Sequence, residues 1–126
     1  MDARPAGPYR FAWRDGAPAQ IDWAPVIRAV ADDARAGVLA AEIGARFHGA
    51  VADLIVLGAR RLRATTGLTR VALSGGVFQN VTLLSAAVGG LRGAGFDVLW
   101  HQRVPANDGG LALGQAAIAQ FTRTGI

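Results

Sequence analysis

Two short apolar segments of this 126-residue chain each run into a diglycine turn that opens a helix. The first is Val71–Asn80, with the sequence VALSGGVFQN, and the second ends in Val104–Gly110, with the sequence VPANDGG. Strand–loop–helix units in series favour a parallel sheet, and the loops at the carboxyl ends of its strands bind ligands. The sequence therefore predicts an α/β protein whose two glycine turns meet at one edge.

Apolar periodicity and turn residues predict a short hairpin, two helices and then a parallel βαβα half. The hairpin strands are expected at Tyr9–Arg14 and Gln20–Trp23, and the two helices at Ala24–Ala36 and Leu39–Thr65. The βαβα half comprises strands Val71–Ser74 and Asp97–His101 and helices Phe78–Gly93 and Asp108–Thr122. Residues 1–8 have no periodicity and are interpreted as a linker or a truncated end.

Apolar residues at helical spacing predict which faces of the helices are buried. The expected core positions of the shorter helices are Val26, Ile27, Val30, Val81, Leu84, Val88 and Leu91. The long helix carries the stripe Leu39, Ile43, Phe47, Ala50, Leu54 and Leu57. Its glycines, Gly44, Gly49 and Gly58, weaken the helix, so we expect close packing against another helix or the sheet at these positions.

The composition excludes several classes of site. The chain has no cysteine, which excludes disulfides, thiolate metal sites and a cysteine nucleophile within it. All its basic residues are arginine, and a Walker-type phosphate loop requires lysine. The only arginine cluster, Arg60–Arg63, lacks interleaved aromatic residues, so no nucleic-acid surface is expected. No apolar run approaches the roughly 20 residues that cross a bilayer, so a cytoplasmic protein without membrane contact is expected.

The first turn offers a site for an anionic ligand. Gly75 and Gly76 let the backbone approach a ligand closely, although any tight turn between a strand and a helix favours glycine. Asn80 follows within one helical turn, where a carboxamide can read a ribose hydroxyl or a base edge. The alternative for Asn80 is a solvent-facing helical asparagine.

The second turn places a carboxylate, Asp108, at the start of a helix. Capping of that helix explains an acidic residue there, but it does not explain the two glycines that follow. This pattern suggests that a metal ion or a phosphate comes close to Asp108. One carboxylate cannot hold a metal ion alone, because three or more ligands are expected.

The remaining polar candidates favour structural roles. His48 lies beside the apolar stripe of the long helix and is interpreted as a histidine at the edge of the core with a hydrogen-bond partner. His101 ends the second strand at the edge expected for a site, but no His-x-x-x-His pair accompanies it. Ser74 has no identifiable base, so nucleophilic catalysis by this serine is not indicated.

The two turns together resemble the C-terminal part of the HypF family, the carbamoyltransferases of nickel–iron hydrogenase maturation. The residues that carry this resemblance are Val71–Asn80, a Gly-Phe-Asp-Val strand and Val104–Gln115, and the upstream segments Ile21–Pro25 and Ala45–His48 are also similar. The resemblance covers nearly the whole chain. It implies the ribonuclease-H-like second lobe of a domain of the actin, sugar-kinase and heat-shock ATPase superfamily, whose two lobes enclose a nucleotide.

The resemblance also implies roles for individual residues. Gly75, Gly76, Val77 and Asn80 would bind ATP or carbamoyl-adenylate. Asp108 would be one ligand of a divalent metal, iron or zinc, whose other ligands lie outside this chain. In this family a carbamoyl group passes from carbamoyl-adenylate to the C-terminal cysteine of the partner protein HypE. The catalytic residues stay unassigned.

The chain departs from the HypF family in lacking an acylphosphatase-like domain, zinc-finger-like cysteines, an adenylate-forming domain and an upstream histidine-rich motif. We therefore expect residues 9–126 to be a fragment that is inactive alone and that either self-associates or is marginally stable, because the surface that would face the first lobe is exposed. Two alternatives stay open, a lobe of a tRNA threonylcarbamoyl-adenosine transferase and a non-catalytic interaction module. The segment Phe78–Asn80 favours the hydrogenase branch.

Overall fold

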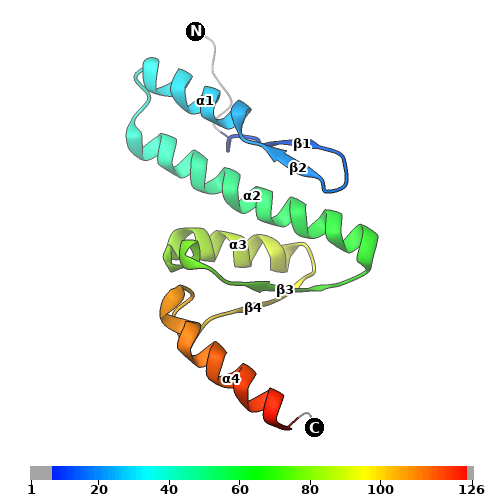
Figure 1. Cartoon of the computed structure of the whole chain (residues 1–126). Helices are drawn as coiled ribbons and strands as arrows, with labels where there is room; N and C mark the ends of the chain where they lie inside the picture. Colours follow the sequence, from blue (N-terminus) through cyan, green and yellow to red (C-terminus); the bar gives the residue numbers. More distant parts are fainter. Residues whose placement is uncertain (1–6, 125–126) are drawn as a thin grey trace.

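The computed structural model describes residues 7–124 (Figure 1). Most of the linker expected at residues 1–8 lies outside this range. The elements follow the predicted order, beginning with an antiparallel hairpin of β1 (Ala12–Arg14) and β2 (Gln20–Asp22). Both strands are shorter than predicted. The α/β class expected from the sequence is confirmed.

Two helices follow the hairpin, and each ends at a glycine. They are α1 (Ala24–Arg35) and α2 (Ala40–Thr66). Gly37 and Gly67 have φ angles of 78° and 73°, in the left-handed region that glycine adopts without steric cost. The glycines therefore set the length of both helices, within one residue of the prediction.

The C-terminal half alternates strands and helices. Its elements are β3 (Arg70–Leu73), η1 (Gly76–Gln79), α3 (Val81–Gly93), β4 (Asp97–Trp100), η2 (Asp108–Gly110) and α4 (Leu111–Thr124). The strands β3 and β4 are parallel, with Leu73 opposite Trp100. The predicted parallel pairing is therefore confirmed, although this sheet has only two strands in the described residues. Figure 1 shows α1 and the hairpin at one end of the molecule, followed by α2, α3 and the parallel strands, with α4 at the other end.

Two apolar clusters form the core, and α2 contributes to both. The first cluster joins α2 to α3 and the parallel strands, and its buried members are Leu73, Ala87, Val88, Leu91, Phe96 and Val98. The second cluster joins α2 to α1 and the N-terminal segment, and its buried members are Tyr9, Val26 and Ala50. Helix α2 thus connects the hairpin half of the molecule to the half that carries the glycine turns.

Several predicted core positions are wrong. Ile27 and Val81 are 59% and 73% exposed, and Leu39 and Leu57 of the long stripe are also exposed. On α3, Val88 and Leu91 are buried as predicted and Leu84 packs against the first cluster, but the buried face begins at Leu83 rather than Val81. Helical spacing identifies a stripe, but the neighbouring element decides which part of that stripe is covered.

Of the glycines of α2, Gly58 confirms the expected packing against a sheet, since Trp13 belongs to β1, whereas Gly49 packs on Pro8, which lies outside the helices and strands. A β-carbon at Gly49 would lie 3.2 Å from Pro8 Cβ, and one at Gly58 would lie 3.6 Å from Trp13 Cη2. At Gly44 no atom lies within 4 Å of that position, so close packing is wrong there. The N-terminal segment therefore packs along α2 at two of its three glycines.

Helix α4 extends away from the other helices (Figure 1). Its large apolar side chains are exposed, namely Leu111, Leu113, Ile118 and Phe121. An apolar helix surface of this kind is typical of an interaction face. Across residues 7–124, we find no helix with the length and apolar character needed to span a membrane.

Candidate functional site

The two glycine turns lie side by side at the carboxyl ends of β3 and β4. The backbone N–H of Gly75 donates to the Ala106 carbonyl oxygen at 2.9 Å. A β-carbon at Gly76 would lie 3.9 Å from Asn107 Cβ. The expectation that both turns meet at one edge of the sheet is therefore confirmed. In Figure 1, α3 and α4 both begin at this edge.

The glycines of the first turn differ in what the fold requires of them. Gly75 has a φ angle of 107°, which L side chains rarely adopt, and its N–H is already bonded within the chain. Gly76 has no positive φ, and its β-carbon position meets only the ordinary contact with Asn107. Val77, predicted with them, is exposed in η1. Backbone geometry thus explains Gly75 but not Gly76.

Asn80 has a structural role that the sequence did not predict. The helix begins at Val81 rather than Phe78, and Asn80 is its N-cap, with Oδ1 accepting the Leu83 N–H at 3.1 Å. The Asn80 Nδ2 atom lies 2.8 Å from Nε2 of His48 on α2. Asn80 is therefore neither a mid-helix residue nor free of contacts. The predicted hydrogen-bond partner of His48 is confirmed.

Asp108 is exposed beside the first turn. Its neighbour Asn107, not Asp108, caps η2, since Asn107 Oδ1 accepts the Gly109 N–H at 2.9 Å. In residues 7–124 no three histidine, cysteine, aspartate or glutamate side chains group as a metal site. The chain alone therefore does not make a metal centre.

Steric contacts within the loop explain the two glycines that follow Asp108. A β-carbon at Gly109 would lie 2.9 Å from Asn107 Oδ1, and one at Gly110 would lie 2.9 Å from the Pro105 carbonyl oxygen. Side chains there would collide with the preceding loop. The two glycines are therefore no independent indication of a ligand beside Asp108.

A serine–histidine pair occupies the same edge, where the sequence suggested no base for the serine. Ser74 Oγ and His101 Nε2 are 2.8 Å apart, and both residues are exposed. They directly follow Leu73 and Trp100, which are opposite each other in the parallel register. Aligning the two strand ends would have identified the pair. Ser74 and His101 also line a cavity of about 270 Å³ bordered by the loop that contains Asn107.

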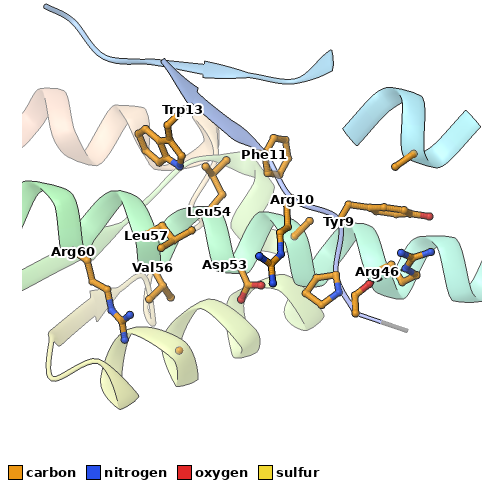
Figure 2. Close-up of a pocket in the computed structure, with 15 residues that line it drawn as sticks. Tyr9, Arg10, Phe11, Trp13, Arg46, Asp53, Leu54, Val56, Leu57 and Arg60 are labelled. Carbon is orange, nitrogen blue, oxygen red and sulfur yellow. Dashed lines mark hydrogen bonds between the residues drawn. The ribbon is translucent and has the colours of Figure 1, made fainter. Parts of the chain in front are cut away.

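A larger cavity, of about 900 Å³, lies between the N-terminal segment and α2 (Figure 2). Apolar side chains of Trp13, Leu54 and Leu57 face it together with charged side chains of Arg10 and Asp53. No residue of either glycine turn lines it. It is therefore separate from the edge at which the predicted site residues meet.

A buried charged cluster stabilises the wall of the larger cavity. Asp33 is 3% exposed and forms an ion pair with Arg46, and it accepts the Tyr9 hydroxyl at 2.6 Å. The Arg46 guanidinium also lies 4.3 Å from the centre of the Tyr9 ring. Burial, followed by the hydrogen bond to Asp33, raises the pKa of the Tyr9 hydroxyl above its ordinary value of 10.0.

The comparisons with known proteins agree on one family. Residues 1–115 match the family model described as carbamoyltransferase, Kae1-like domain, second subdomain. Carbamoyltransferase HypF of Synechocystis is 37% identical over 95 residues, which are 75% of this chain and 12% of the relative. The Cupriavidus necator HypF homolog is 42% identical over 91 residues, which are 72% of this chain and 23% of that protein.

A solved structure extends the similarity to the fold. The crystal structure of full-length HypF in its phosphate- and nucleotide-bound form matches with a TM-score of 0.86 and 36% identity. The match covers 93% of this chain and 16% of that protein. The chain thus spans between about an eighth and a quarter of the length of these relatives. It belongs to the HypF carbamoyltransferase family and corresponds to the second subdomain of the Kae1-like domain.

Proposed function

We propose that this chain is the nucleotide-binding lobe of a carbamoyltransferase. The complete protein would transfer a carbamoyl group from carbamoyl-adenylate, made from carbamoyl phosphate and ATP, to the C-terminal cysteine of HypE in hydrogenase maturation. The lobe would be ribonuclease-H-like and the protein cytoplasmic. The isolated chain would lack transfer activity and would self-associate through its exposed apolar surface.

One observation carries the proposal, the hydrogen bond between Gly75 N and the Ala106 carbonyl oxygen. It holds the Gly75–Gly76 turn against the loop that carries Asp108, so a nucleotide bound at the first turn would lie near a carboxylate. Family membership supports a transferase, and the similar HypF structure was determined with phosphate and nucleotide bound. Gly75, Gly76, Val77 and Asn80 are the proposed nucleotide residues.

The proposed transfer breaks the bond between the carbamoyl carbon and an adenylate phosphate oxygen, and it forms a bond from that carbon to sulfur. The thiol loses its proton, and AMP leaves with the bonding electrons. This chain would contribute by holding the adenosine part of the donor at Gly76 and Asn80. Asp108 would supply one ligand of a divalent metal that other parts of the complete protein complete. The described residues do not form that metal site alone, so no step is assigned to the metal.

A chimera tests the proposal. Residues 1–115 replace the matching segment of an active HypF relative, and mass spectrometry follows carbamoylation of the HypE C-terminal cysteine. We expect the chimera to carbamoylate HypE and the Asp108→Asn chimera to lose this activity. Asp97→Asn is the matched control, because Asp97 is exposed at the opposite end of β4, where it forms an ion pair with Arg70. A folded chimera without transfer, or equal activity of the Asp108→Asn chimera, would contradict the proposal.

A further inference from the structure

A directed series of hydrogen bonds connects α2 to the start of α3. His48 Nδ1 lies 2.8 Å from the Gly44 carbonyl oxygen, and His48 Nε2 lies 2.8 Å from Asn80 Nδ2. A carbonyl oxygen only accepts, so Nδ1 carries the ring hydrogen and Nε2 of the neutral ring accepts from Asn80. The other end of the carboxamide, Oδ1, accepts the Leu83 N–H. All the partners are consistent with a single orientation of the Asn80 carboxamide.

We propose that His48 is a positioning residue for nucleotide recognition, because it fixes the orientation in which Asn80 presents its carboxamide. The inference rests on the proposed function for the role of Asn80. Asn80 is exposed, and after these two contacts its carboxamide retains one N–H donor and one oxygen lone pair. Those are the two groups with which an asparagine pairs with a ribose hydroxyl or a base edge. His48 therefore determines which of them meets each part of the nucleoside.

Protonation of His48 is incompatible with this arrangement. An imidazolium carries hydrogen on both nitrogens, so Nε2–H would face the Nδ2 donor of Asn80. Reversal of the carboxamide would offer Oδ1 to His48, but it would then place Nδ2 against the Leu83 N–H, which is also a donor. Asn80 therefore cannot both cap α3 at the Leu83 N–H and form a hydrogen bond with a protonated His48. Acid would therefore release Asn80 and open the first turn of α3.

The acidic residues on the elements packed around His48 are not positioned to form an ion pair with a positively charged His48 ring. Neither η1 nor α3 has an acidic side chain, and the one basic residue of α3, Arg92, is in its last turn. On α2 the acidic residues are Glu42 and Asp53, six and five positions away from His48, whereas helix neighbours are three or four apart. Arg46 is held by the buried ion pair described above. The neutral ring is thus the form that fits this environment.

The test is a pH titration of the 126-residue chain by NMR, combined with ATP binding. On acidification we expect the Asn80 side-chain amide and the Leu83 amide to shift together with the His48 ring. As these signals shift, the ATP affinity should fall about fivefold further than in His48→Gln, the value of one hydrogen bond. His48→Gln keeps a neutral acceptor on α2, so its affinity should match the wild type at pH 8 and fall less than that of the wild type on acidification.

His101→Gln is the matched control, because it removes the other histidine and should leave the coupled shifts in place. Independent titration of Asn80 and His48, or the same pH dependence of ATP affinity in wild type and His48→Gln, would overturn the inference. Absence of ATP binding by the wild type at pH 8 would instead overturn the proposed function, and with it the recognition role of His48. The coupled shifts at Asn80 would then report a cap alone.

Discussion

Gly90 of α3 lies so close to Val56 of α2 that a β-carbon on the glycine would come within 2.8 Å of the Val56 Cγ2 atom. This contact joins the helix that follows the first glycine turn to the helix that spans both apolar clusters. The close approach of α3 to α2 also brings Asn80 to His48. The packing of the two helices therefore supports the candidate site.

Adjacent glycines of α3 provide the first prediction. Gly90→Ala should destabilise the chain by about 1–3 kcal/mol, because the new methyl group has no space against Val56. Gly89→Ala should stabilise it by up to about 1 kcal/mol, because no atom lies within 4 Å of that β-carbon and alanine favours the helix. Urea unfolding measures both. Equal effects of the two substitutions would exclude the close contact between the helices.

The buried ion pair provides the second prediction. Arg46→Leu should destabilise the chain by about 3–5 kcal/mol, because it removes the Arg46 guanidinium from a buried ion pair with the Asp33 carboxylate. Arg35→Leu is the control, since Arg35 and Asp32 form an exposed pair 3.8 Å apart that is worth about 0–1 kcal/mol. Thermal and urea unfolding of both variants give the difference. Similar stability of the two variants would show that Asp33 does not need Arg46.

The third prediction concerns alkaline pH. The raised pKa of Tyr9 means that its hydroxyl must stay protonated in the folded chain, so its stabilising effect is complete below about pH 10 and is lost as the pH rises through the folded value. Tyr9 is the only tyrosine, so tyrosinate absorbance reports this residue alone. Tyr9→Phe should remove the alkaline loss of stability that is due to this group. Ionisation of Tyr9 at or below pH 10 in the folded chain would contradict the prediction.

The fourth prediction distinguishes a structural role of Gly75 from a ligand-binding role of Gly76 in the first glycine turn. Gly75→Ala should cost about 1–2 kcal/mol of stability, because alanine is strained at a φ angle of 107°. Gly76→Ala should change stability by less than about 0.5 kcal/mol, because its β-carbon meets only an ordinary contact. The same substitution should weaken ATP binding, where the methyl group obstructs the backbone. A stable Gly76→Ala chain with unchanged ATP affinity would remove Gly76 from the site.

Much of the fold was predictable because its signals are local. Glycine ends α1 and α2, and each glycine turn follows a strand, so the order of elements and the parallel pairing follow from the sequence. The predicted burial of Ile27 and Val81 is wrong, because burial depends on where a neighbouring element ends. Composition and spacing contain no information on that position.

The candidate site was predictable only in outline. The meeting of the two turns follows from topology, since both come after parallel strands. The contacts between His48 and Asn80 and between Ser74 and His101 join residues far apart in the sequence. The first depends on how α2 lies across α3, and the second on the register of β3 and β4. Neither arrangement is determined by local residue patterns.

The central claim is that the two glycine turns form a nucleotide-binding edge, and titration of the ¹⁵N-labelled chain with ATP tests it most directly. We predict saturable shifts of the Gly75, Gly76 and Asn80 amide signals, while the Trp13 and Leu57 amides beside the larger cavity stay unchanged. Shifts confined to that cavity, or no shift at Gly75, Gly76 and Asn80 at millimolar ATP, would contradict the claim.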